Sequence, residues 1–185
     1  MPPSGASWVS QFPTSRATSS LAGSFRTSVE SFIAALRSAG ASVTISATFR
    51  PLERAYLMHY AFQIARQGLP PASVPAYPGV DIQWTHTDSI GNPDPVASRA
   101  GATAMVQAYN IVHLPSLTSR HTEGLAIDMN IAWSGSLNIA LPTGGAQNIT
   151  TTPRSGANAE LHSVGSKYGV IKLVSDRPHW SNDGH

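Results

Sequence analysis

A clear hydrophobic pattern begins at about Ser24 and runs to Leu36. Apolar side chains recur there every three or four residues, which is the period of one face of an α-helix. They are Phe25, Val29, Phe32, Ile33 and Leu36. Gly40 follows where a glycine commonly ends a helix. The pattern predicts an amphipathic helix that packs one face against a core.

The period changes from helical to alternating over residues 43–49. Every second residue is apolar there, as in a strand with one buried face. The apolar positions are Val43, Ile45, Ala47 and Phe49. Arg50 ends the polar series, and Pro51 stands at a favourable start for a second helix over residues 52–67. Arg50 is therefore expected at a strand-to-helix junction.

Residues 68–95 are rich in proline and glycine and predict a long connection, interrupted by a short strand at Val80, Ile82 and Trp84. Long ordered loops in small domains are often functional. Asp94 and Pro95 form a cap and first-turn signal for a helix that runs to about Tyr109.

A second alternating pattern covers residues 125–131. Leu125, Ile127, Met129 and Ile131 fall on one face of the predicted strand. Asp128 falls on the opposite face and points away from the apolar set. A glycine turn at Gly124 separates this strand from a loop that carries His121.

The last third of the chain predicts a hairpin, a short helix and a final strand. Residues 137–139 and 148–150 flank a proline and two glycines, which favours a hairpin. A helix follows over residues 157–168, and an apolar strand over residues 170–174. The whole pattern indicates an α+β fold with a small, mostly antiparallel sheet flanked by helices. We expect an N-terminal arm over residues 1–23 and one domain over residues 24–185.

Composition excludes several classes of protein. The 185 residues include 12 Lys+Arg and 10 Asp+Glu, and the only lysines are Lys167 and Lys172, so there is no clustered positive charge for nucleic acid. No apolar run approaches the ~18 residues of a membrane span, and residues 1–10 lack the pattern of a signal peptide. We expect a protein made in the cytoplasm that does not insert into membranes.

Cysteine is absent, so a metal site must use histidine and carboxylate ligands. Catalytic zinc usually takes three such ligands and leaves one position open. His121, Asp128 and His179 supply this set. Pro178 favours a turn after Asp176, which leaves Asp176 available as a general base. Glu123 is an alternative base, although a solvent-exposed role suits it better.

Other metal and nucleophile motifs do not fit. The His-x-Glu at residues 121–123 resembles that of zinc deaminases, which also require a pair of cysteines. The chain contains no His-Glu-x-x-His motif and no Gly-x-Ser-x-Gly motif. A histidine and an aspartate seven residues apart are common by chance, so specificity comes from their combination with Asp176, His179 and Arg50.

That combination resembles the zinc peptidoglycan peptidases. The first motif, Ser-x-His-x2-Gly-x-Ala-x-Asp, spans residues 119–128, and the second, Asp-x-x-His-Trp, spans residues 176–180. The family comprises D-Ala-D-Ala carboxypeptidases and dipeptidases and the L-Ala-D-Glu endolysins of phages, and it shares the hedgehog/DD-peptidase fold. The order of the motifs and the arginine at residue 50 also agree. The similarity covers residues 24–181.

The resemblance implies a role for each matching residue. One Zn²⁺ would be held by His121, Asp128 and His179, with Asp176 as the acid and base. Arg50 would stabilise the oxyanion, and Ser119 and Trp180 would line the substrate pocket. Asp rather than Glu as the catalytic acid is similar to the endolysin branch.

The resemblance predicts hydrolysis of a peptide bond in the peptidoglycan stem by a monomer that acts on the cell wall. A phage or prophage endolysin, a tail-associated enzyme and a bacterial enzyme exported by another route all fit. The alternatives are a D-Ala-D-Ala carboxypeptidase or dipeptidase, another zinc hydrolase such as an amidase, and a zinc-containing binding module without turnover. A binding module has no need of Asp176 and Arg50.

Overall fold

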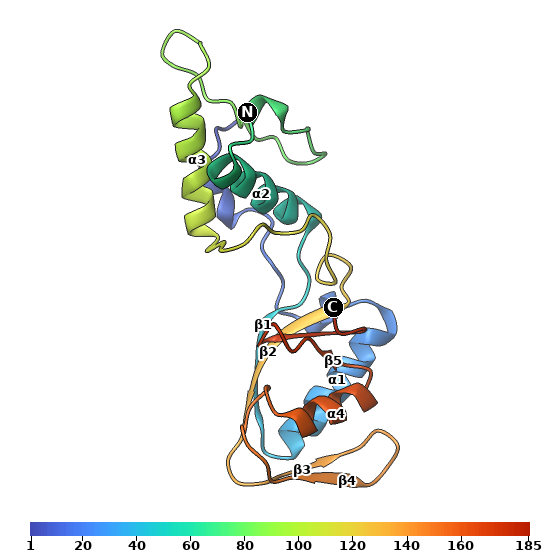
Figure 1. Ribbon diagram of the computed structural model, residues 1–185. Coiled ribbons are helices and arrows are strands. Elements are labelled where there is room, and N and C mark those ends of the chain that lie inside the picture. Colours follow the sequence, from blue (N-terminus) through green and yellow to red (C-terminus); the bar gives the residue numbers. More distant parts are fainter. The chain divides into compact units, whose positions relative to one another are not determined.

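A computed structural model describes residues 1–185, and the chain forms two compact units (Figure 1). Unit 1 comprises Met1–Pro13 and Pro51–Ser119, and unit 2 comprises Thr14–Arg50 and Arg120–His185. The two units are groups of residues that contact one another in space, and each is made of two separate stretches of the chain. The predicted division along the sequence, into an arm over residues 1–23 and a domain over residues 24–185, stays a prediction. No helix is both long and apolar enough to cross a membrane.

Unit 1 is built on two helices, α2 (Leu52–Phe62) and α3 (Pro95–Ala108). A wider helical turn, Gln63–Gln67, extends α2 and ends at Gly68, whose φ of 74° is left-handed. The Asp94 carboxylate caps α3 by accepting a hydrogen bond from the Ala97 N–H at 2.9 Å. Short 3-10 helices cover Ala6–Ser10 and Pro71–Ser73. Both predicted helices are confirmed.

The short strand predicted at Val80, Ile82 and Trp84 is wrong. These side chains are buried, but the segment forms only isolated bridges, in which Val80 pairs with Tyr77 and Gln83 pairs with Pro3. The alternating pattern indicated burial without a partner strand long enough to form a ladder. The three side chains join the unit 1 core with Trp8, Tyr56, Leu57, Ala61, Ile64, Ala65, Ala102, Met105 and Val106.

Unit 2 contains a four-stranded antiparallel sheet in the order β1-β2-β6-β5. Its strands are β1 (Ser42–Ala47), β2 (Ala126–Ala132), β6 (His179–Ser181) and β5 (Ile171–Lys172). The helices of unit 2 are α1 (Gly23–Ser38), α4 (Ala159–Lys167) and a 3-10 turn at Thr18–Ser20. Strands β3 (Leu137–Ala140) and β4 (Ala146–Ile149) form a separate hairpin. The coarse α+β prediction with a small antiparallel sheet is confirmed.

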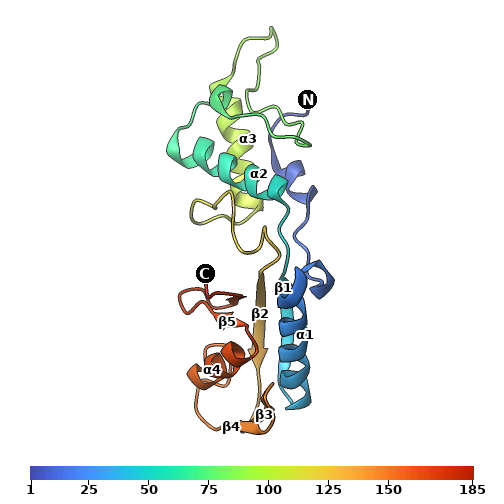
Figure 2. The ribbon, with the colours of Figure 1, turned by 90° about the vertical axis from the view of Figure 1, so that its right-hand side faces the viewer.

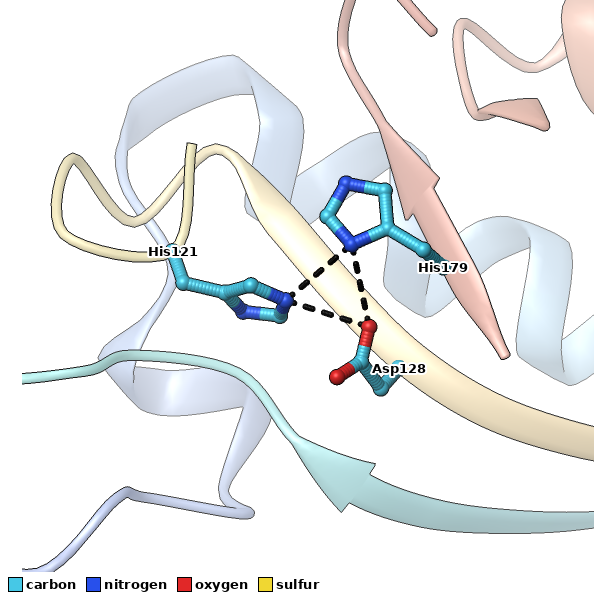
Figure 3. A group of neighbouring side chains, drawn as sticks. All are labelled: His121, Asp128 and His179. Atoms are coloured by element: carbon cyan, nitrogen blue, oxygen red, sulfur yellow. Dashed lines mark hydrogen bonds and ion pairs between the residues drawn. The ribbon is translucent and has the colours of Figure 1, made fainter. Parts of the chain in front are cut away.

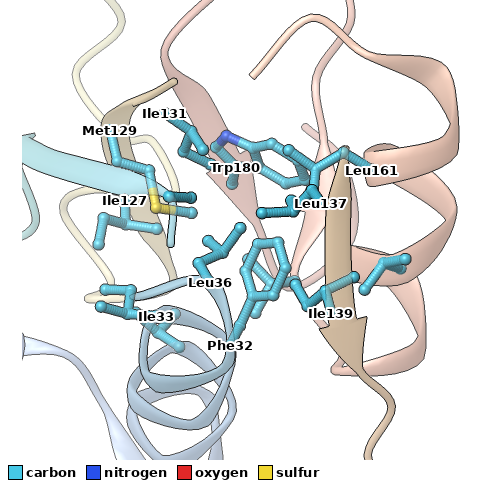
Figure 4. Packing of buried hydrophobic residues seen from close by; sticks show 14 of the residues in the cluster. Phe32, Ile33, Leu36, Ile127, Met129, Ile131, Leu137, Ile139, Leu161 and Trp180 are labelled. Atoms are coloured by element: carbon cyan, nitrogen blue, oxygen red, sulfur yellow. The ribbon is translucent and has the colours of Figure 1, made fainter. Parts of the chain in front are cut away.

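The core of unit 2 lies between one face of the sheet, helices α1 and α4, and the β3–β4 hairpin (Figure 4). Figure 2 shows α1 running beside β1. All five apolar residues of the predicted α1 stripe are buried. Phe32 packs on Trp180 with ring centroids 5.6 Å apart, and Leu161 of α4 is fully buried. Ile127, Met129 and Ile131 of β2 also face this core, which leaves the opposite face of β2 for Asp128.

Two strand lengths differ from prediction. Strand β1 ends at Ala47 rather than at Phe49, after a register shift between Ile45 and Ala47. The final apolar strand is only Ile171–Lys172, and the unpredicted strand β6 follows it. At three residues, β6 is too short for an alternating pattern to stand out. It nevertheless carries the last predicted metal ligand.

Candidate metal centre

Two strands and a turn of unit 2 bring His121, Asp128 and His179 together (Figure 3). His121 lies in the turn before β2, Asp128 lies within β2, and His179 is the first residue of β6. Asp128 and His179 are directly opposite in the β2–β6 ladder. Side chains opposite each other in a ladder lie on the same face of a sheet. The pairing therefore places two ligands side by side, and the turn supplies the third.

The turn at residues 121–124 depends on Gly124. Its φ is +70°, a conformation that L side chains rarely adopt. A Cβ at this position would lie 3.1 Å from the Ala22 nitrogen, and the Gly124 carbonyl accepts a hydrogen bond from that same N–H at 2.9 Å. The glycine thus allows the turn to close tightly against the segment before α1, which directs His121 towards β2.

The three ligand atoms have the spacing of a metal site. The Nε2 of His121 lies 3.1 Å from the Oδ1 of Asp128 and 3.2 Å from the Nδ1 of His179, which is itself 3.1 Å from the same Oδ1. Ligands about 2.0–2.1 Å from a tetrahedral zinc ion lie roughly 3.3 Å apart. The arrangement therefore fits one small ion held by two nitrogens and one oxygen.

Each histidine is oriented by a main-chain oxygen on its far side. The Nδ1 of His121 lies 2.8 Å from the Thr48 carbonyl, and the Nε2 of His179 lies 3.0 Å from the main-chain oxygen of His185. A carbonyl oxygen can only accept, so these two nitrogens are the donors. In the neutral rings the nitrogens that face Asp128 then carry lone pairs. A main-chain acceptor behind each imidazole in this way fixes the tautomer of metal-binding histidines.

Without a cation, three electron-pair donors would converge within 3.2 Å. His121 and His179 are buried and Asp128 is largely so, which makes water a poor substitute. Burial raises the pKa of Asp128, but the two imidazoles, which in their protonated forms would donate to its carboxylate, outweigh burial and hold the pKa well below its usual range. Burial lowers the pKa of His179, but the hydrogen bond to Asp128 leads the effects that raise it overall. The site therefore attracts positive charge.

Asp176 and Arg50 lie on the segments that lead to the ligands. Asp176 is exposed, three residues before His179, and its carbonyl accepts the His179 N–H at 3.2 Å. Its charge is the smallest of the effects that raise the pKa of His179. Arg50 is half-buried, and its N–H donates to the His121 carbonyl at 3.0 Å. The catalytic roles of both residues stay predictions.

Trp180 is fully buried in the unit 2 core. It is opposite Ile127 in the β2–β6 ladder, and its ring packs edge-on against His162 at 5.6 Å. Because neighbouring residues of a strand point to opposite faces, Trp180 lies on the core face while His179 faces the metal centre. Its observed contribution is to packing in the core, and its role in lining a substrate pocket stays a prediction. Ser119 is the last residue of unit 1, and its role as a substrate contact stays a prediction.

Sequence reasoning missed the groups that support the ligands. The Thr48 carbonyl and the main-chain oxygen of His185 carry no signal, because every residue has a carbonyl. Lys172 does carry one, since it is a charged residue between Ile171 and Leu173 in an otherwise apolar strand. Its side chain is buried beside the Asp176–His179 turn.

Comparison with models of known protein families, with curated proteins and with solved structures finds no match. The metal-binding arrangement of His121, Asp128 and His179 therefore rests on the geometry of this chain.

Proposed function

We propose that unit 2 carries a zinc-dependent peptidase site that hydrolyses a peptide bond in the stem of bacterial peptidoglycan, on a hedgehog/DD-peptidase-like fold. We favour an L-Ala-D-Glu endopeptidase of the endolysin type, which acts on the cell wall as a monomer. The observation that carries the proposal is the convergence of His121, Asp128 and His179 with both imidazoles oriented by main-chain oxygens.

Zinc suits the donor set better than other common ions. Calcium and magnesium favour sites made of oxygen, whereas two imidazole nitrogens and one carboxylate are typical of catalytic zinc. Three protein ligands also leave a fourth position for water or substrate. A structural zinc site would more commonly have four protein ligands, and the described structure groups only three.

The residues around the ligands fit peptide hydrolysis. A zinc ion bound by these ligands supplies Lewis acidity, which polarises a carbonyl and acidifies water. Asp176 takes the proton from the attacking water and returns it to the leaving amine, so one carboxylate serves both halves of the reaction. Arg50 donates to the carbonyl oxygen as negative charge develops there. The tie between the Arg50 N–H and the His121 carbonyl keeps this cation on the segment next to a ligand.

The substrate class rests on the motif resemblance. Residues 119–128 and 176–180 follow the order and spacing of the zinc peptidoglycan peptidases, with Arg50 at the end of the segment after β1. The peptidoglycan stem is therefore the partner to test first. The structure adds that the three ligands of this motif set converge in unit 2.

The direct test is digestion of purified sacculi by the purified protein, with and without a chelator, followed by mass analysis of the released fragments. New amino termini on D-Glu are the expected result, and zinc should restore activity after chelation. Release of free D-Ala would instead identify a carboxypeptidase. If the protein binds zinc at one equivalent and releases no fragment, the peptidase proposal for this substrate is wrong.

Two variants separate metal binding from catalysis. Asp176→Asn should retain one zinc per chain and lose at least the 10²–10⁴-fold contribution typical of a general acid and base. His179→Ala should lose both zinc and activity. Asp81→Asn is the matched control, because Asp81 is an exposed acidic residue in unit 1. Full activity in the Asp176→Asn variant would remove Asp176 from the mechanism.

A further inference from the structure

Lys172 is a buried lysine whose ammonium lies inside the loop that carries the second motif. Its side chain belongs to β5, and the residue is only 7% exposed. The Nζ donates to the carbonyls of Leu173 at 2.6 Å and His179 at 2.9 Å, and also to the carbonyl of Asp176. An ammonium has three donors. All three are accounted for by carbonyl oxygens of residues 173–179.

The same three carbonyls also link the loop to itself. The Asp176 N–H donates to Leu173, the His179 N–H donates to Asp176, and the Leu173 N–H donates to His179, each at 3.2 Å. These bonds form a closed ring of three residues with the Lys172 ammonium at its centre. The backbone bonds are long for N–H···O contacts, whereas the bonds from the lysine to the Leu173 and His179 carbonyls are shorter. The ammonium therefore contributes strongly to the shape of the loop.

Lys172 is also linked to the unit 2 core through Trp180. Lys172 is opposite Trp180 in the β5–β6 ladder, and its Nζ lies 5.6 Å from the centre of a Trp180 ring, within cation–π range. Trp180 is itself fully buried against Phe32. The core thus fixes the position of the ammonium, and the ammonium fixes the loop.

We propose that Lys172 is a positioning residue for the metal centre, which sets the loop at residues 173–179 so that His179 reaches the metal and the Asp176 carboxylate stays beside it. Burying a charge is costly unless it is fully hydrogen-bonded. An apolar side chain would fill this buried position at lower cost, so the charge of Lys172 indicates a specific role. The effect on His179 follows from the metal geometry alone, and the effect on Asp176 rests on the proposed function.

The metal-binding part is tested with cobalt(II) in place of zinc, because the visible absorption of bound cobalt reports the geometry of its ligands. Lys172→Met keeps a similar side-chain length and removes the charge and the donors. We expect it to weaken cobalt binding by about 10- to 100-fold, the range typical when a group that orients a metal ligand is lost, and to change the spectrum. Lys167→Met is the matched control, since Lys167 is the only other lysine and is exposed on α4.

Lys172→Arg provides a second variant if Lys172→Met does not fold. Arginine keeps the charge, but its planar fork cannot aim three donors from one atom at three converging carbonyls. We expect a folded protein with weaker cobalt binding and an altered spectrum. If either substitution at Lys172 leaves a folded protein with the cobalt affinity and spectrum of the wild type, the positioning role is refuted.

The activity of the same variants on sacculi tests the effect on Asp176. We expect kcat to fall in zinc-saturated Lys172→Arg while KM stays within about twofold, because the loop holds a catalytic group and not the bulk of the substrate. An unchanged kcat would refute this part. If the wild type releases no fragments, the peptidase proposal fails, and the cobalt measurements still decide whether Lys172 supports the metal ligands.

Discussion

Replacing Asp128 by asparagine should reverse the stability order of the wild type and the variant when the metal is removed. In the wild type, the Asp128 carboxylate faces the lone pairs of both imidazoles, and the group attracts a cation. An asparagine amide has almost the same shape but can donate to the lone pairs of His121 and His179, which lie 3.1 Å from the present oxygen. The variant therefore replaces a metal ligand with a group that satisfies the site without metal.

The magnitudes follow from mass action. Zinc at 100 times its dissociation constant stabilises a protein by about 2.7 kcal/mol, which for a unit of about 100 residues raises Tm by roughly 10–20 °C. Loss of a direct ligand should weaken binding by at least about 100-fold, the upper range for losing a group that only orients a ligand. The same zinc concentration would then stabilise the Asp128→Asn variant by only about 0.4 kcal/mol. In chelator, new hydrogen bonds worth about 0.5–1.5 kcal/mol each should make the variant at least as stable as the wild type.

Thermal unfolding followed by circular dichroism at pH 8 gives the Tm of the wild type and of the Asp128→Asn variant, each with chelator and with added zinc. Asp81→Asn, an exposed change in unit 1, should leave the zinc-induced shift of Tm unchanged. A variant at Asp128 that zinc stabilises as strongly as the wild type would refute the assignment of this carboxylate as a ligand. If the Asp128→Asn variant is much less stable than the wild type in chelator, the converging lone pairs do not destabilise the metal-free protein.

Two further predictions concern stability alone. Gly165→Ala should lower the free energy of unfolding in urea by about 1–3 kcal/mol, despite the helix preference of alanine, because its Cβ would lie 2.7 Å from the Trp180 ring. Gly156→Ala is the control, since its Cβ would lie 3.9 Å from the nearest neighbouring atom. Equal stabilities of the two variants would contradict the clash. Burial raises the pKa of Tyr109 to about 12, against a smaller opposing effect of Arg54. The unfolded chain ionises near pH 10, so the stability that comes from burying the neutral phenol is fully present below pH 10 and is progressively lost from pH 10 to 12. Tyr109→Phe should therefore lose less stability than the wild type over that range, and equal losses in alkaline urea titrations would refute this effect.

The sequence predicted the elements whose buried faces repeat over several turns or pairs. The five-residue stripe of α1 and the alternation of β2 both correspond to buried positions, because packing against a core imposes the period of each element. The same reasoning failed where burial came without a ladder, at Val80 to Trp84, and where a strand was only three residues long, at β6. Periodicity reports burial, and it reports a strand only when a partner runs alongside for several residues.

The metal ligands and their supports differ in how visible they are in a sequence. His121, Asp128 and His179 are identified by their side chains, so a motif can record them. The groups that orient the two imidazoles are main-chain oxygens, of Thr48 and His185, which any residue would supply. Only the path of the chain places them, and substituting the Thr48 side chain would leave its carbonyl in position. Lys172 is the exception, because its support acts through a side chain. The support of the metal ligands can therefore be tested by substituting Lys172. The main-chain oxygens that accept from the imidazoles can be displaced only by moving the backbone.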